Sequence, residues 1–325
     1  MMQDTLIMPQ SELVVEPFHN VVADQPRANS TRRPRLAVRR ILLPFDLSWA
    51  SVRALRAASQ VAEKIGANIH LLHVVRPAGQ PEVEPTTNRA DDRLADDSER
   101  VLKQWVKRVV QGRVQTFVSI RIGDPVDVIV ARAVAMRADL IVMTSRSCSG
   151  QKNELQRSCA ERVSRLAPCP LLTIPEKCAD ELAYSMEQFL DGNWRSILMP
   201  VDFSRAAETA LQFAGQLSQK KSAKLLLAHG SESANSVADE IRLRKWAEKI
   251  LDEPVAFETA IWPGGHSLYA ILLDALRSEA NLIVLPTQVD SWARRLRAGS
   301  ITDGVLRQAR CPVLSINDNV SRSEN

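Results

Sequence analysis

The chain has 325 residues, of which 45% are hydrophobic and 25% are charged, and its formal net charge is +4. This length fits two domains of ordinary size, and the composition is typical of a soluble globular protein. No run of eighteen apolar residues is present, and residues 1–20 lack the basic start and apolar block of a signal peptide. The sequence therefore predicts a cytoplasmic protein without a membrane span.

Most of the positive charge lies near the N-terminus. Residues 25–40 hold six arginines and no acidic residue, so the remainder of the chain has a net charge of −2. Residues 1–38 mix prolines, arginines and polar residues without a sustained hydrophobic period, which predicts a disordered basic tail. The arginines fit either a solvated linker or contact with an acidic partner, anionic lipid or nucleic acid. Because residues 25–40 offer no aromatic side chain to stack on bases, nucleic acid is the least favoured of these partners.

The sequence contains an internal repeat. ILLPFDLS at 41–48 recurs as ILMPVDFS at 197–204, and CPLLTI at 169–174 recurs as CPVLSI at 311–316. The first offset is 156 residues and the second is 142, so the first repeat carries about 14 extra residues. The stretch at 78–92 (AGQPEVEPTTNRADD) accounts for them, and its prolines and acidic residues predict a surface excursion.

In chain order, the first repeat predicts alternating strands and helices. Short apolar runs and amphipathic periods give a strand at 39–46, a helix near 48–65, a strand at 68–75, a helix around 94–109, a strand at 114–122, a helix near 125–137, a strand at 139–144, a helix near 155–166 and a strand at 170–174.

The second repeat predicts the same order. Its strands are expected at 195–202, 223–230, 254–262, 281–286 and 312–316, with helices near 204–220, after the second strand, near 266–279 and near 297–308. Five strands alternating with four helices predict a doubly wound, Rossmann-like parallel sheet in each repeat. A proline opens each fifth strand, at Pro170 and Pro312, which favours an edge position for that strand.

Neither cysteine nor histidine residues form a recognisable cluster. The number of cysteines is odd and none forms a CxxC pair, which argues against disulfides or a zinc site: Cys148, Cys159, Cys169, Cys178 and Cys311. His73 and His229 hold equivalent positions near strand ends, where we expect packed or hydrogen-bonded rings. No metal-ligand spacing is present.

Candidate ligand-binding residues lie at the carboxyl ends of the first and fourth strands. Asp46 and Asp202 end the first strands, and Thr144 and Pro286 end the fourth. In an open parallel sheet these ends border the ligand crevice. Each aspartate can accept hydrogen bonds from a sugar or an amine, or can cap the following helix, and one side chain can do both. Neither a GxxxxGK[ST] loop nor a GxGxxG fingerprint is present.

Taken together and in this order, these segments resemble the universal stress protein family. The resemblance rests on the first strands and their aspartates, on the second strands ending LHVV and LAHG, and on two longer pairs: GDPVDVIVARAVAMRADLIVM with GGHSLYAILLDALRSEANLIVL, and SCAERVSRLAPCPLLTI with GSITDGVLRQARCPVLSI. It covers about 39–175 and 195–317. We therefore expect domains at 39–176 and 195–318, a linker at 177–194 and a C-terminal tail at 319–325.

ATP-binding members of this family carry a loop after the fourth strand, with the pattern Gly, two residues, Gly, nine residues, Gly, then Ser or Thr. The corresponding positions are Thr144, Ser147, Arg157 and Ser158 in the first repeat, and Pro286, Val289, Gly299 and Ser300 in the second. Glycine amides can approach phosphates closely, whereas proline has no amide and valine resists positive φ. The resemblance therefore implies a degenerate loop in both repeats, with the first the better site.

The nucleotide-binding residues implied by the resemblance are Asp46, Val74, Thr144, Ser145, Ser147, Arg157, Ser158, Asp202, Gly299 and Ser300. Serine hydroxyls and Arg157 offer partial substitutes for the missing amides, although an arginine on a solvated helix face is the alternative interpretation. ATP is the one cofactor that the resemblance allows.

The predicted function is a stress-response or regulatory binding module in which ATP binding is weak or absent. Two alternatives remain open: a member that binds or slowly hydrolyses ATP, and an adaptor that docks an acidic partner through its arginine-rich tail. The sequence shows no general base, nucleophile pair or metal cluster, so we do not expect an enzyme. Because family members dimerise through the fifth strand, we predict an intramolecular pseudo-dimer of the two repeats, with a homo-oligomer and an unidentified protein partner also compatible.

Overall fold

The computed structural model describes residues 38–76, 89–145, 158–175, 195–219, 223–232, 236–251, 255–287 and 301–320, with residues 89–95 described by their backbone alone. The predicted disorder of the N-terminal tail, the linker at 177–194 and most of the excursion at 78–92 fall outside these ranges. So do four of the candidate site residues: Ser147, Arg157, Gly299 and Ser300.

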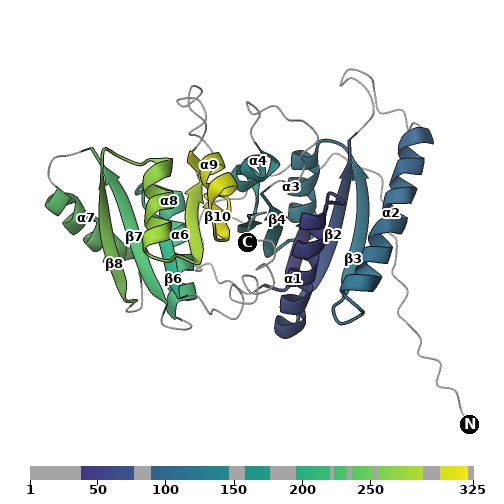
Figure 1. Ribbon diagram of the computed structural model, residues 1–325, viewed down its shortest axis with the longest axis horizontal. Coiled ribbons are helices and arrows are strands. Elements are labelled where there is room, and N and C mark those ends of the chain that lie inside the picture. Colours follow the sequence, from purple (N-terminus) through teal and green to yellow (C-terminus); the bar gives the residue numbers. More distant parts are fainter. Residues whose placement is uncertain are drawn as a thin grey trace, which may run out of the picture.

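The first domain is a parallel sheet with the strand order β3-β2-β1-β4-β5 (Figure 1). Its elements are β1 (Arg40–Pro44), α1 (Trp49–Ile65), β2 (Asn68–Val75), α2 (Arg89–Val109), β3 (Thr116–Ile122), α3 (Pro125–Ala135), β4 (Leu140–Thr144), α4 (Cys159–Leu166) and β5 (Leu171–Ile174). The predicted doubly wound fold is confirmed. Each predicted strand is present, and the largest difference is at the start of α2, which begins at Arg89 and not near residue 94.

The second domain repeats this arrangement in the order β10-β9-β6-β7-β8. Its elements are β6 (Ser196–Pro200), α6 (Arg205–Gln219), β7 (Lys224–Ser231), α7 (Ser236–Ile250), β8 (Phe257–Pro263), α8 (Leu268–Arg277), β9 (Leu282–Thr287), α9 (Ile301–Gln308) and β10 (Val313–Asn317).

Local sequence signals set the helix limits. Ser48 caps α1 by accepting a hydrogen bond from the amide of Ser51, and Gly66 ends the helix with φ of 70°. Asp124 caps α3, and Pro125 occupies the first turn, where its missing amide proton costs no hydrogen bond. Because each helix connects two parallel strands, these helix starts lie at the carboxyl ends of the strands that precede them.

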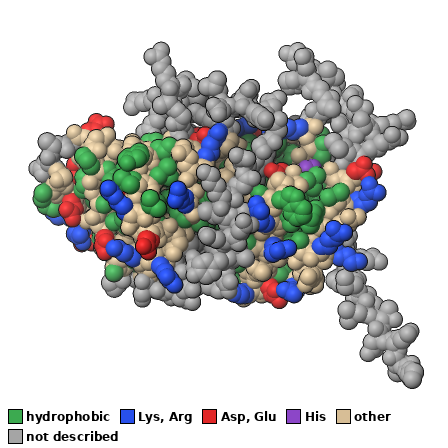
Figure 2. Space-filling view, in the orientation of Figure 1, with side chains coloured by type: hydrophobic (Ala, Val, Ile, Leu, Met, Phe, Trp, Pro, Cys, Tyr) green, Lys and Arg blue, Asp and Glu red, His purple; other side chains and the backbone are tan. Residues whose placement is uncertain are grey.

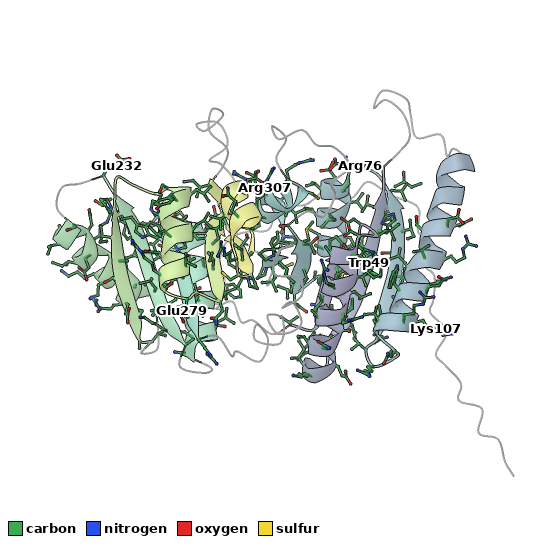
Figure 3. All side chains as sticks on the ribbon, viewed as in Figure 1. Trp49, Arg76, Lys107, Glu232, Glu279 and Arg307 are labelled. Carbon is green, nitrogen blue, oxygen red and sulfur yellow. The ribbon has the colours of Figure 1, made fainter. Side chains whose placement is uncertain are left out.

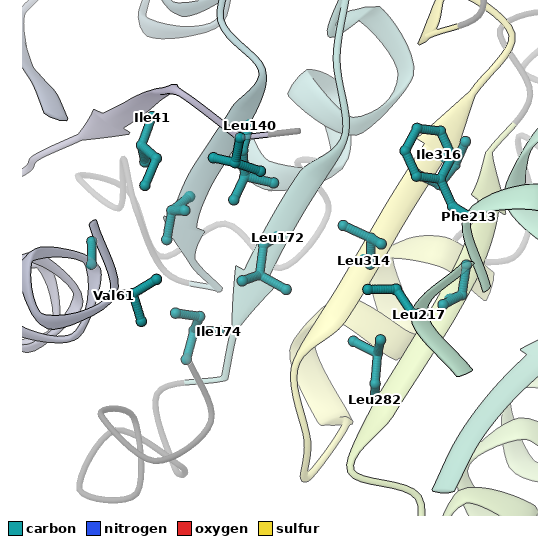
Figure 4. Packing of buried hydrophobic residues seen from close by; sticks show 14 of the residues in the cluster. Ile41, Val61, Leu140, Leu172, Ile174, Phe213, Leu217, Leu282, Leu314 and Ile316 are labelled. Atoms are coloured by element: carbon teal, nitrogen blue, oxygen red, sulfur yellow. The ribbon is translucent and has the colours of Figure 1, made fainter. Parts of the chain in front are cut away.

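The two domains share one ten-stranded sheet. β5 and β10 pair antiparallel, with Leu172 opposite Leu314 and Thr173 opposite Val313. One apolar cluster extends on the α1 and α6 side of the sheet from Ile41 through Leu172 and Leu314 into the second domain (Figure 4). The predicted intramolecular pairing of the fifth strands is thereby confirmed, and it covers two apolar edges that would otherwise promote aggregation.

Polar contacts between the domains surround the end of α4. Asn317 Nδ2 donates hydrogen bonds to the carbonyl oxygens of Ser164 (2.8 Å) and Ala167 (3.0 Å). Thr287 Oγ1 donates to the same Ser164 oxygen at 3.0 Å. Side chains of the second domain thus satisfy carbonyl groups that the last turn of an α-helix leaves unpaired.

No helix in the described parts of the chain is both long and apolar enough to cross a bilayer. Among the described cysteines, Cys159, Cys169 and Cys311 are not disulfide-bonded. Burial raises the pKa of the Cys169 thiol, so it is protonated at neutral pH. Cys169 and Cys311 are both buried in the cores of their domains.

Candidate functional site

The crevice of the first domain begins at Asp46, which follows β1. Asp46 Oδ1 accepts hydrogen bonds from the backbone amide of Ser48 (3.1 Å), from Ser48 Oγ (2.5 Å) and from Ser51 Oγ (2.6 Å). None of the hydrogen bonds that Asp46 makes within the described residues uses its other oxygen, Oδ2. The carboxylate therefore organises the start of α1 through Oδ1.

The turn after this aspartate is unusual in both domains. Leu47 has φ of 63° and Phe203, the equivalent residue, has φ of 58°. A non-glycine residue in this region costs about 1 kcal/mol or more, so the surrounding hydrogen bonds must hold it in place. Asp202 holds the second turn through the amide (3.0 Å) and Oγ (2.6 Å) of Ser204.

The equivalent histidines support these turns. His73 Nδ1 donates to the carbonyl oxygen of Phe45 at 2.7 Å, and His229 Nδ1 donates to that of Val201 at 2.7 Å. Because a carbonyl can only accept, Nε2 is the unprotonated nitrogen in each neutral ring. Both rings are hydrogen-bonded, as predicted.

Thr144 and Ser145 lie at the end of β4 and are buried. Thr144 pairs with Ile174 in the register of β4 and β5, and the Ser145 amide donates to the Ile174 carbonyl at 3.0 Å. Val74 lies near the end of β2, half-buried and packed against the core on the α3 side of the sheet. Asp46, Val74 and Thr144 thus border the same end of the first-domain sheet.

Ser158 has a role at the contact between the domains. Its Oγ accepts a hydrogen bond from the amide of Glu161 (3.1 Å) as the N-cap of α4, and donates one to Asp303 Oδ1 in the second domain (2.8 Å). Asp303 in turn pairs with Arg307, which lies on α9 where the two domains meet (2.8 Å; Figure 3). The resemblance identified Ser158 as a phosphate ligand, and the structure commits its hydroxyl proton to the interdomain contact.

In the second domain the β8–α8 loop packs directly against the end of β7. Gly230, at the position of Val74, lies so close to the β8–α8 loop that an added Cβ would be 2.2 Å from the backbone nitrogen of His266. The Gly230 amide donates to His266 Nε2 at 3.3 Å. In the first domain the corresponding Asp124 caps α3 instead, and Val74 carries a side chain at the position where the second domain has Gly230.

Cavities elsewhere do not involve these aspartates. A cavity of about 210 Å³ lies between α1 and α2 at the opposite, amino end of the sheet and is lined in part by Arg56, Arg108 and Arg113. A wider one of about 500 Å³ lies at the amino ends of β7 and β8.

Comparison with known proteins identifies the family. A family model described as the universal stress protein family matches residues 37–175 and 193–317, which is most of the chain. The chain belongs to the universal stress protein family. It is 30% identical over 139 residues to a universal stress protein of Methanocaldococcus jannaschii, an alignment that covers 42% of this chain and 81% of that protein. A universal stress protein of Thermus aquaticus is 28% identical over 134 residues, covering 41% of this chain and 96% of that protein.

A solved structure extends the likeness over both domains. The crystal structure of a universal stress protein from Archaeoglobus fulgidus has a TM-score of 0.64 with this chain at 24% identity, and covers 85% of this chain and 94% of that one. At this identity the likeness shows the fold alone. The tandem arrangement of universal stress protein domains predicted from the repeat is confirmed.

Sequence reasoning missed an aromatic cluster in the second universal stress protein domain. Phe203 packs against His229 (4.6 Å between ring centroids) and Trp246 (5.4 Å), and His266 packs against His229 (5.2 Å). The predicted helix near 266–279 begins two residues later, at Leu268, which leaves His266 in the loop. These residues come from separate elements, so no local pattern could reveal the cluster. The available signal was the repeat offset of 156 residues, which makes Gly230 the equivalent of Val74.

Proposed function

We propose that this tandem universal stress protein is a regulatory binding module of a stress response, and that it binds ATP weakly and only in the crevice of its first domain. The observation that carries the proposal is the packing of the β8–α8 loop against Gly230 in the second domain. His266 and the backbone beside it occupy the space next to Gly230. A ligand entering there would have to displace this loop and the aromatic contacts of His266.

The first-domain crevice retains an acceptor for a ligand. Asp46 Oδ1 is saturated by its three contacts with Ser48 and Ser51. Its Oδ2 is therefore the oxygen that a ribose hydroxyl or an amine would meet. Since the turn is already fixed before a ligand arrives, little ordering entropy is lost at this point of contact.

Two features support weak affinity. Ser158 Oγ carries a single proton, which it donates to Asp303, so a bond to phosphate would require breaking the interdomain bond. Thr144 stands where ATP-binding family members have the first loop glycine, and its buried side chain leaves less room for a phosphate than glycine would. We propose binding rather than turnover because Asp46 and His73 both serve to hold the β1–α1 turn.

Calorimetric titration with ATP tests the proposal. We expect a dissociation constant above about 10 μM for the wild type, at least about tenfold weaker binding for Asp46→Ala, and a change of less than about twofold for Asp202→Ala. The two substitutions remove the same carboxylate from equivalent turns, so each is the control of the other. Submicromolar binding that Asp202→Ala abolishes and Asp46→Ala leaves intact would overturn the proposal.

A further inference from the structure

Three positions on the α3 side of the first domain differ in polarity or charge from their counterparts in the second. They are His70 on β2, Arg121 on β3 and Arg132 on α3. His70 pairs with Leu42 as Leu226 pairs with Leu198, so Leu226 is the counterpart of His70.

The arginines have equally clear counterparts. His73 lies opposite Ile120 and His229 opposite Ile261, so the next residues, Arg121 and Trp262, correspond. The carbonyls of Arg132 and Asp274 both accept the helix-ending hydrogen bond from the residue four positions later, which places them at the same point of α3 and α8.

The second domain shows that these two positions face each other. Trp262 Nε1 donates a hydrogen bond of 2.5 Å to Asp274 Oδ2. This bond joins β8 to α8 and satisfies both polar groups. The fold therefore brings the side chain at the end of the outer strand within hydrogen-bonding reach of the side chain on the helix.

In the first domain the same two positions hold two positive charges. Arg121 Nη1 donates to its neighbour's carbonyl, that of Ile120, at 2.9 Å, and Arg132 Nε is buried without a hydrogen-bond partner. Within the described residues neither arginine has a carboxylate partner. Asp124, at the start of α3, contacts Arg162, and Asp139, which follows α3, pairs with Arg40.

His70 adds a third polar group to this surface. Its ring stacks on Phe117 with centroids 4.6 Å apart and planes at 22°, and its Nδ1 is buried without a hydrogen-bond partner. Burial and the positive charges of Arg132 and Arg40 lower the pKa of His70 to about 4. At neutral pH the ring is therefore uncharged, with one N–H to donate.

An anion would compensate this arrangement. Two half-buried guanidinium groups repel one another, and burial together with Arg121 lowers the pKa of Arg132. The planar guanidinium matches the oxygen spacing of phosphate, sulfate or carboxylate groups. We propose that Arg121 and Arg132 bind a small tetrahedral oxyanion, of the phosphate or sulfate type, on the α3 side of the first domain.

This site is separate from the proposed ATP contact at Asp46. Arg121 is adjacent to Val74 in the register of β2 and β3, but Arg132 stands about two helical turns beyond the start of α3, over the body of the sheet. Anion binding here consequently does not depend on the proposed function, and Asp46→Ala should leave it unchanged.

The test is calorimetric titration of the full chain with inorganic phosphate and with sulfate, against chloride at matched ionic strength. We expect saturable binding of phosphate and sulfate, with a dissociation constant of about 1 mM or below, and none of chloride. Arg132→Gln and Arg121→Gln should each weaken binding at least about tenfold. Arg56→Gln, which removes the same charge from the exposed face of α1, should change it less than about twofold.

A second readout reports on the site directly. Because a bound oxyanion offsets the charge of Arg132, phosphate should raise the pKa of His70 in an NMR titration of the histidine rings, with His70→Gln used for assignment. Equal heats from phosphate and chloride, equal weakening by Arg56→Gln and Arg132→Gln, or a His70 pKa that phosphate does not move would each overturn the proposal.

Discussion

His70 illustrates how the fold controls the charge of a single residue. The ring is held neutral by burial and by Arg132 and Arg40, which lower its pKa to about 4 from the ordinary value of 6.5. Between these two values the unfolded chain binds a proton that the folded chain does not. His70 therefore contributes stability that is complete above about pH 6.5 and is lost as the pH falls toward 4.

Replacing this ring with the residue of the second domain tests the assignment. Between pH 6.5 and 4, we expect the unfolding free energy of His70→Leu to fall by about 1–2 kcal/mol less than that of the wild type. This figure is smaller than the whole pKa shift would give, because the ring is only half-buried and solvent screens its charge. Urea unfolding at pH 7.5, 5.5 and 4.5 measures it. If the unfolding free energy falls as steeply with pH in the variant as in the wild type, the pKa of His70 is not lowered in the folded protein.

At the scale of elements, β5 and β10 are the strands that make two domains into one sheet. Leu172 and Leu314 lie opposite each other at this junction, and both are fully buried in the cluster that extends into each domain. The contacts of Asn317 and Thr287 with the end of α4 add hydrogen bonds across the same boundary. We therefore expect the two domains to unfold together.

Leu314→Ala tests this coupling. The substitution should cost about 2–5 kcal/mol, because it leaves a cavity in a closely packed core, and should lower the stability of both domains in a single transition. Leu276→Ala is the control, because this α8 side chain is 60% exposed and should change stability by less than about 0.5 kcal/mol. Figure 2 shows that hydrophobic side chains lie at the surface of the second domain. Urea unfolding followed by circular dichroism and by tryptophan fluorescence provides the measurement. Two separate transitions, with only one shifted by Leu314→Ala, would contradict the coupling.

For the whole molecule, the repeat and the order of strands could be predicted because apolar runs such as those at 140–144 and 282–287 are local signals. The pairing of the fifth strands could be predicted from exposed apolar edges and from the family resemblance. Contacts between distant elements could not. Ser158 matches a phosphate-binding motif, but its bond with Asp303 exists only because the two domains pack together.

The packing of the β8–α8 loop against β7 could not be predicted for a related reason. Gly230 carries no side chain, and its significance depends on how the β8–α8 loop folds against it. The pairing of Arg121 with Arg132 likewise becomes visible only when their counterparts, Trp262 and Asp274, are seen bonded to each other. Comparing the two repeats position by position within one structure is what reveals both features.

The central claim is that ATP binds in the first domain and not in the second. The most direct test is to locate the bound nucleotide. Photoaffinity labelling of the full chain with 8-azido-ATP, followed by mass-spectrometric peptide mapping, reports the position even when affinity is low. We expect label in peptides that border Asp46, Val74 or Thr144, reduced by excess unlabelled ATP. Competed label mainly in peptides around Asp202, Gly230 or His266 would contradict this claim and the proposed function with it.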